Sequence, residues 1–145
     1  MGKEYVDMGL PSGTLWASEN EEGCFTFDEA VEKFGNNLPA RWQFCELIDK
    51  CECVFDSGKK ALICKSRLNG NTIEFPALGF RIPDPVTMFN IGDGGYYWSG
   101  SPGPSNYSAW SFCFNYYSSA DPADYSMRLC GQSVRSCKLE KNGIK

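Results

Sequence analysis

The spacing of apolar positions predicts two short helices in the first third of the chain. Thr26 followed by Glu29 is a capping box, which marks the start of a helix. An apolar stripe follows at helical spacing: Phe27, Ala30, Val31 and Phe34. Gly-Asn-Asn at 35–37 ends this helix, and a second helix is expected over 41–50, after the Leu-Pro turn at 38–39. Both helices are short and one-sided, so each must pack on a larger element.

Apolar runs bounded by turn residues predict strands in the rest of the chain. The expected strands cover 5–6, 14–16, 53–55, 61–64, 73–76, 78–81, 96–100, 109–114, 126–129 and 133–137. Residues 83–93 are expected to be a loop, and the charged tail at 138–145 is expected to fray. Early helices followed by many short strands indicate an α+β fold, and the length indicates one domain over residues 1–145.

The segment from Asp93 to Arg135 differs in composition from the rest of the chain. It holds six of the seven Tyr, and no Lys, Arg or Glu occurs between Ile91 and Met127. A mixture of Tyr, Ser, Gly and Asn is typical of recognition loops, where Tyr gives contact area and the small polar residues give adaptable hydrogen bonds. The alternative is a Tyr-rich sheet core with polar turns.

Charge and residue content narrow the possible chemistry. The formal net charge of −4 and the lack of a Lys/Arg cluster argue against nucleic acid and anionic membranes as partners. No apolar run approaches the roughly 20 residues of a membrane span, and the first residues contain no secretory apolar region. The chain has no His, which removes Ser-His-Asp and Cys-His catalysis and His-containing zinc sites.

The eight cysteines lack the paired C-x-x-C spacing of an all-Cys zinc site. Neither a metal nor another cofactor is expected. We expect most of the thiols to be reduced and buried, as free Cys commonly is. A disulfide between two of them remains open, since sequence does not choose the pairing.

Five segments then occur in order across nearly the whole chain: EYVDMGLPSGTLWA (4–17), LPARWQFCELI (38–48), NTIEFPALGFR (71–81), GYYWSGS (95–101) and GQSVR (131–135). Together they resemble the C-type-lectin-like domain of gut Bacteroidetes proteins and their phages. That family overlaps with the variable proteins of diversity-generating retroelements. The resemblance implies two helices packed on a twisted, loop-interrupted antiparallel sheet, a ligand surface in the C-terminal third, and an extracellular, cell-surface or virion location.

Several positions depart from the family pattern. Ala40 stands where the family more often has a hydroxyl residue to cap the second helix, and Ser136-Cys137 replace a Pro-Val pair. Trp98 is followed by Ser99-Gly100, and the Glu-Pro-Asn-type loop of calcium-dependent sugar sites is missing, so calcium is not expected.

An enzymatic alternative comes from the same fold, which also houses formylglycine-generating enzymes with a pair of active-site thiols. Cys130 and Cys137 are the residues that would have that role here. The surrounding pattern is missing and the chain is about half the usual size of those domains, so a non-enzymatic protein is expected.

The codon chemistry of retroelements agrees with a variable surface at about 95–130. Mutagenesis at adenines diversifies Asn codons but does not reach Lys, Glu, Gln, Met or Trp, and none of these five occurs in 111–126. The residues predicted to face the ligand are Tyr97, Ser99, Ser101, Asn106, Tyr107, Asn115, Tyr116, Tyr117, Asp121, Asp124 and Tyr125, with Cys113 and Leu129 as weaker candidates. Strand alternation assigns Tyr96, Trp98, Trp110, Phe112, Phe114 and Val134 to the core.

These observations favour a non-enzymatic display domain that binds a protein or glycan ligand on a cell surface. Aromatic anchors would supply affinity and polar residues specificity. The three Asp of the segment favour a partner that is neutral or basic at the contact. An oligomer is possible. The alternative is a fixed structural or accessory surface module of the same fold.

Overall fold

The computed structural model describes residues 4–83 and 86–139. Helix α1 (Phe27–Phe34) and helix α2 (Arg41–Lys50) lie where the sequence predicts them, joined by a 3-10 turn, η1 (Gly35–Asn37). The capping box at α1 is confirmed: the N–H of Glu29 donates to the Thr26 hydroxyl (3.3 Å), and the N–H of Thr26 donates to the Glu29 carboxylate (2.9 Å). Gly35, with φ of 49°, ends the helix in a conformation that favours glycine.

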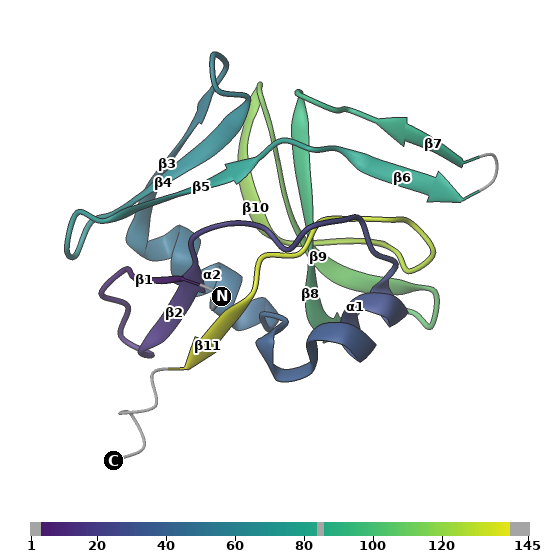
Figure 1. The fold of residues 1–145 in the computed structure, drawn as a ribbon, viewed down its shortest axis with the longest axis horizontal. Helices are drawn as coiled ribbons and strands as arrows, with labels where there is room; N and C mark the ends of the chain where they lie inside the picture. Colours follow the sequence, from purple (N-terminus) through teal and green to yellow (C-terminus); the bar gives the residue numbers. More distant parts are fainter. Residues whose placement is uncertain (1–3, 84–85, 140–145) are drawn as a thin grey trace.

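Within the described residues the strands form four small antiparallel sheets, in the orders β1-β2-β11, β3-β4-β5, β6-β7 and β8-β9-β10 (Figure 1). Their bounds are β1 Tyr5–Asp7, β2 Thr14–Ala17, β3 Cys51–Asp56, β4 Ala61–Ser66, β5 Thr72–Pro76, β6 Phe80–Pro83, β7 Val86–Phe89, β8 Gly94–Pro102, β9 Ser108–Asn115, β10 Ser118–Met127 and β11 Cys137–Leu139. The two helices and these sheets confirm the predicted α+β class.

The β8-β9-β10 sheet has a core on each face. On one face, Phe112 stacks on Phe44 of α2 (centroids 4.9 Å apart) and packs with Phe75 of β5 in the larger core. On the other face, Trp98 packs edge-on against Phe27 of α1 in a smaller core. The two helices therefore cover opposite faces of this sheet, and the residues between them in β8 are enclosed on both sides.

Three strand expectations are corrected. The segment expected as a loop contains β7, which pairs antiparallel with β6. The rings of Phe80 and Phe89 lie opposite each other in this pair and stack with their centroids 5.7 Å apart. Residues 84 and 85 of that segment lie outside the described residues. The strand expected at 126–129 is the end of the longer β10. The strand expected at 133–137 starts instead at Cys137 and pairs with β2, so Lys138 and Leu139 are ordered strand residues. Residues 140–145 of the predicted frayed tail lie outside the described part.

Candidate functional site

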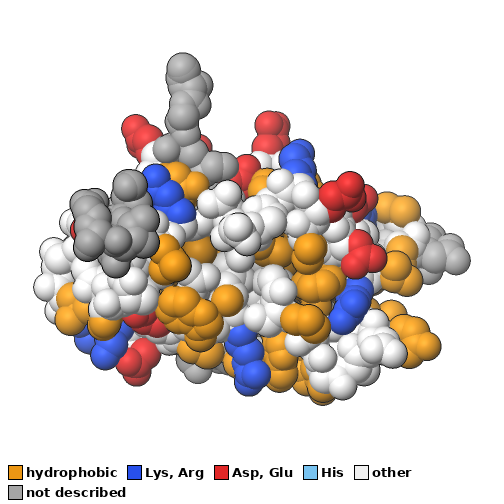
Figure 2. Space-filling view, turned by 90° about the horizontal axis from the view of Figure 1, so that it is seen from below, with side chains coloured by type: hydrophobic (Ala, Val, Ile, Leu, Met, Phe, Trp, Pro, Cys, Tyr) orange, Lys and Arg blue, Asp and Glu red, His pale blue; other side chains and the backbone are white. Residues whose placement is uncertain are grey.

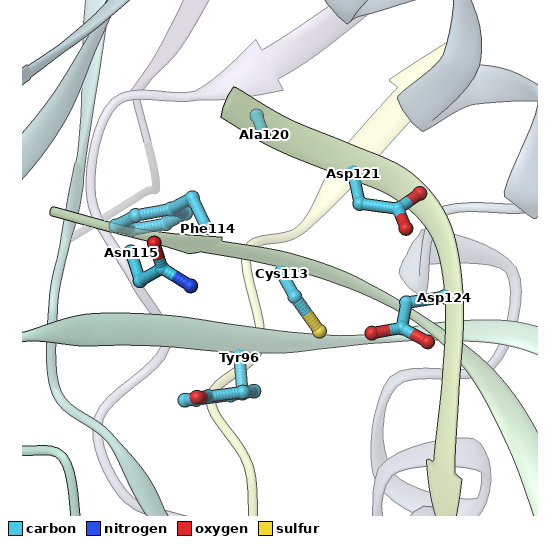
Figure 3. A pocket seen from close by; sticks show the side chains of 7 residues that line it. All are labelled: Tyr96, Cys113, Phe114, Asn115, Ala120, Asp121 and Asp124. Carbon is cyan, nitrogen blue, oxygen red and sulfur yellow. The ribbon is translucent and has the colours of Figure 1, made fainter. Parts of the chain in front are cut away.

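An open pocket of about 400 Å³ lies on the β8-β9-β10 sheet, on the same face as α1. Its lining residues come from all three strands: Tyr96, Cys113, Phe114, Asn115, Ala120, Asp121 and Asp124. Figure 3 shows Cys113 between the Tyr96 ring and the Asp124 carboxylate, with Asp121 above them on the arching β10 strand. Three of the predicted ligand-facing residues, Asn115, Asp121 and Asp124, thus meet in one pocket.

Irregular pairing in β10 places both carboxylates on this face. Asp121 lies opposite Cys113 and Asp124 lies opposite Ser111, so three steps along β10 match two steps along β9. Such a β-bulge inserts one extra residue and re-aims the side chains beside it. Without the extra residue, positions 121 and 124 would point to opposite faces of the sheet.

Tyr96 forms the opposite wall of the pocket and is held by neighbouring elements. Phe80 of β6 packs edge-on against its ring at 4.9 Å, and the side-chain amide of Asn90 donates to its hydroxyl (2.9 Å). Burial raises the pKa of Tyr96, while the Asn90 hydrogen bond lowers it less. Tyr96 is therefore a neutral phenol at physiological pH.

Cys113 is also neutral. Burial, with a smaller contribution from the negative charge of Asp124, raises the pKa of the Cys113 thiol to about 12, and the hydrogen bond with Ser111 opposes the rise. A protonated thiol is a poor nucleophile and a poor metal ligand. The pocket therefore combines carboxylate and amide acceptors with neutral Tyr96 and Cys113.

Two exposed tyrosines adjoin this pocket in the turn between β9 and β10, here called the Tyr116–Tyr117 turn. Tyr116 is 59% exposed and Tyr117 is 75% exposed, and their rings pack edge-on at 4.9 Å. The N–H of Tyr117 donates to the side-chain carbonyl of Asn115, a pocket residue (3.1 Å). The turn is thus tied to the wall of the pocket and presents two aromatic rings beside it.

The remaining exposed candidates lie elsewhere on the sheet. Tyr125 pairs with Trp110, whose ring it touches edge-on at 5.5 Å, and the guanidinium of Arg41 lies 3.7 Å from the Trp110 centroid. Because Tyr125 directly follows Asp124 in the strand, it points to the opposite face. Asn106 and Tyr107 are exposed before β9, at the end of that strand remote from the Tyr116–Tyr117 turn. The structure does not gather all the candidates into one surface.

Two predicted ligand-facing residues, Tyr97 and Ser99, are wrong because they are buried, and a third, Ser101, is half-buried. Tyr97 is fully buried: its hydroxyl donates to the carbonyl of Pro76 and accepts from the Asn20 amide. Ser99 is buried and donates to the carbonyl of Trp110 (2.9 Å). Ser101 is half-buried, and its hydroxyl accepts from the N–H of Arg41 at the start of α2 (3.1 Å). All three side chains face the α2 side of the sheet.

Two expected core residues are also corrected, because Tyr96 and Trp110 are only half-buried. Trp98, Phe112, Phe114 and Val134 are core residues as predicted. Tyr96, Phe114 and Ala120 line the pocket but are not among the residues predicted to face a ligand, and Tyr96 is the polar one among them. The signal that identifies it is its pairing with Cys113, and this pairing is not contained in the sequence pattern of β8 alone.

Three further features concern the surface charge, the possible metal ligands and the helix lengths of the described residues. On the face shown in Figure 2, Lys and Arg side chains are scattered among apolar, neutral and acidic ones and form no large basic patch. Within the described ranges, no group of three or more Cys, Asp or Glu residues is arranged to hold a metal ion. Over the same ranges, no helix has the length and apolar character needed to cross a membrane.

Comparisons with known proteins gave no match to a family model, to a curated protein or to a solved structure.

Proposed function

We propose that the chain is a non-enzymatic ligand-binding display domain with a C-type-lectin-like fold, related to the variable proteins of diversity-generating retroelements. Its contact surface is the pocket together with the Tyr116–Tyr117 turn. The observation that carries the proposal is the convergence of Asn115, Asp121 and Asp124 in one open pocket beside two exposed aromatic rings. Two features support that fold: the five segments that carry the resemblance, and the helices on opposite faces of a bulged antiparallel sheet.

The chemistry of the surface suits a ligand that donates hydrogen bonds. Asp121 and Asp124 accept from hydroxyl or cationic groups, and charge-assisted hydrogen bonds of this kind are the stronger ones. The rings of Tyr116 and Tyr117 provide flat apolar area with a polar tip, which suits sugars and protein side chains alike. The ligand is a protein or glycan on a cell surface, and the domain acts outside the cell or on a virion, as the resemblance implies.

Binding experiments test the surface directly. The labelled domain would be applied to a glycan microarray and to intact gut Bacteroidetes cells, and the strongest signal would be titrated with variants. We expect Tyr117→Ala and Asp124→Asn each to weaken binding about tenfold or more, as central anchors do. Circular dichroism melting should stay unchanged, because both substitutions lie outside the core.

Matched controls come from the β3-β4-β5 region. The side chains of Val54 and Leu68 are more than half exposed, at 57% and 53%, and do not line the pocket. Val54→Ala and Leu68→Ala should therefore keep full binding. A ligand that binds all four variants equally well would place the contact surface elsewhere and contradict the proposal.

A fixed structural module is the second candidate, and one observation favours it. Apolar side chains are exposed along β6-β7 and its flanks: Leu78, Val86, Met88, Phe89 and Ile91. This hairpin extends from one corner of the molecule (Figure 1), and exposed apolar patches of this kind mark interaction sites. If this module is the function, substitutions at 115–117 and Tyr125 should lower stability or assembly in sedimentation velocity, whereas a display domain tolerates them.

Active diversification is tested by the DNA around the gene. A near-copy of the segment coding for Tyr96 to Arg135, differing mainly at adenines and lying near a reverse transcriptase gene, is expected if the surface varies. The differing positions should include the codons of Asn115, Tyr116 and Tyr117. A locus without such a copy would leave a fixed adhesin or structural module.

A further inference from the structure

Two cysteines of the β3-β4 hairpin face each other directly. All eight cysteines are free thiols. Cys53 of β3 lies directly opposite Cys64 of β4, and their sulfur atoms are 3.1 Å apart. Lys50 and Arg67 lie opposite each other three positions along the ladder from Cys53 and Cys64, and the N–H of Arg67 donates to the carbonyl of Lys50 (2.9 Å). Lys50 and Arg67 are therefore a hydrogen-bonded pair. Hydrogen-bonded and non-hydrogen-bonded pairs alternate in antiparallel ladders, so Cys53 and Cys64, three positions away, form a non-hydrogen-bonded pair.

That position fits the geometry of a disulfide. Side chains of a non-hydrogen-bonded pair are the closer ones, with Cα atoms about 4.5 Å apart, and disulfides span Cα separations of about 4.4–6.8 Å. The two thiols can therefore join without moving the backbone out of its register. The sequence left the pairing of any disulfide open, and the ladder now selects one pair.

We propose that Cys53 and Cys64 are an oxidisable thiol pair that exchanges with a small disulfide such as glutathione disulfide to form a cross-strand bond in the β3-β4 hairpin. This modification site is separate from the pocket on β8-β9-β10 and does not depend on the ligand-binding proposal.

The surroundings assign different roles to the two thiols. Cys53 is half-buried, and Cys64 is fully buried in the larger core. The hydrogen bond with Cys64 lowers the pKa of Cys53, burial opposes this, and the charge of Arg67 adds to the lowering. The same hydrogen bond and then burial raise the pKa of Cys64. Cys53 is the more exposed thiol and Cys64 the buried one, so Cys53 is the attacking residue and Cys64 the resolving residue.

The exchange proceeds in two balanced steps. The Cys53 thiolate attacks one sulfur of glutathione disulfide, the sulfur–sulfur bond of that molecule breaks, and one glutathione thiolate leaves. Cys64 then loses its proton and attacks the Cys53 sulfur of the mixed disulfide, and the second glutathione thiolate leaves. The two protein thiols are oxidised, and glutathione disulfide is reduced to two glutathione molecules.

Cys51 is the neighbouring thiol against which the pair must be tested. It lies two residues before Cys53 on the same side of β3 and is buried. Burial, and to a smaller extent the nearby Cys53, raises the pKa of Cys51 to about 12. Cys51 is thus protonated at physiological pH, and its pairing partner across the ladder is Ser66.

The experiment equilibrates the reduced 145-residue chain in glutathione buffers of increasing oxidised fraction. Each sample is quenched with acid, its free thiols are alkylated and the protein is digested with trypsin. Cleavage after Lys50, Lys59, Lys60 and Lys65 places the two cysteines in separate peptides, 51–59 and 61–65. A disulfide between them therefore appears as a linked peptide pair in the mass spectrum.

We expect the linked pair in the wild type and in Cys51→Ser, and its loss in Cys53→Ser and Cys64→Ser. The oxidised wild type should melt on the order of 5 °C higher than the reduced form, because the bond restricts the unfolded chain. Dithiothreitol should reverse the rise. The wild-type and Cys51→Ser results test the proposal even if the core variant Cys64→Ser fails to fold.

Three results would overturn the proposal. The first is full alkylation of Cys53 and Cys64 in the most oxidising buffer. The second is a stable glutathione adduct on Cys53 with no linked peptide, which would show that Cys64 does not resolve it. The third is a linked pair that disappears in Cys51→Ser, which would assign the bond to Cys51.

Discussion

Arg135 is a buried cation whose partners are neutral oxygens. It is 1% exposed, and its Nε and Nη2 atoms both donate to the side-chain oxygen of Asn20 (3.0 and 2.8 Å). The carbonyls of Ala17 and Glu74 accept further hydrogen bonds from the guanidinium, which lies 4.5 Å from the ring of Phe75. Arg135 therefore links the N-terminal segment, β5 and the C-terminal segment through one side chain.

Replacing this residue should cost more stability than any surface substitution. Arg135→Leu leaves the oxygens of Asn20, Ala17 and Glu74 buried without donors, and we expect the free energy of unfolding to fall by about 3 kcal/mol or more. Urea denaturation followed by tryptophan fluorescence measures the change. Arg67→Leu, at an exposed arginine, should change stability by less than about 0.5 kcal/mol. Similar losses for both variants would contradict the linking role of Arg135.

The side chains of β8 show where residue-scale prediction ends. Alternation correctly predicts that Tyr96 and Tyr97 face opposite sides, but the choice of Tyr97 as the outward residue is wrong. Both tyrosines have the same local pattern, and only the packing of Phe75 and Phe112 against Tyr97 decides between them. That packing comes from strands distant in sequence. Asn115, Asp121 and Asp124 could be predicted because they lie beside a tight turn or a bulge. A polar side chain there reaches solvent whichever face of the sheet it points to.

At the scale of elements, helix α2 has a cap supplied by another segment. Ala40 at its N-cap has no side-chain acceptor, because an alanine side chain carries no polar atom. The hydroxyl of Ser101 in β8 accepts from the N–H of Arg41 (3.1 Å), and the side chain of Gln43 accepts from the N–H of Ala40 (2.8 Å). The sheet thereby satisfies a donor that the local sequence leaves free.

This arrangement predicts a compensating pair of substitutions. Ser101→Ala should lower the free energy of unfolding by about 0.5–1 kcal/mol, and Ala40→Ser in the same chain should restore most of it, because a serine at the N-cap accepts from the N–H of the second or third helical residue. Thermal unfolding of the two single variants and the double variant gives the coupling between the sites. If Ala40→Ser gives no gain in a chain that carries Ser101→Ala, a local cap does not offset the bond that β8 supplies.

The elements that could be predicted are those with local signals. Both helices follow from a capping box, an apolar stripe and terminating residues, and the β3-β4 hairpin follows from its turn. Strands β7 and β11 are short, and their partners β6 and β2 decide their existence. The bulges of β10 lie between Ser118 and Asp121 and between Asp121 and Asp124. They depend on pairing with β9, which no periodicity along a single strand contains.

At the scale of the whole molecule, several small sheets share one interior that contains ionisable thiols. Cys51 and Cys137 are 2% and 1% exposed, and burial raises the pKa of each to about 12 from the ordinary value of 9.0. Burial likewise raises the pKa of Cys113 to about 12 and raises the pKa of Tyr97. The three thiols come from three different sheets, and Tyr97 shares the β8-β9-β10 sheet with Cys113.

The protein should therefore lose stability in alkaline solution. Between pH 9 and 12 the unfolded chain releases thiol protons that the folded chain retains. The free energy of unfolding is therefore unaffected by these thiols below pH 9 and falls as the pH rises towards 12. Each buried thiol contributes at most about 1.4 kcal/mol per pH unit to the slope. Urea titrations of the reduced protein across this range measure it, and Cys137→Ala should show a shallower fall than the wild type because one such thiol is gone. A free energy of unfolding that stays constant across this range would show that these thiols ionise in the folded protein as easily as in the unfolded chain.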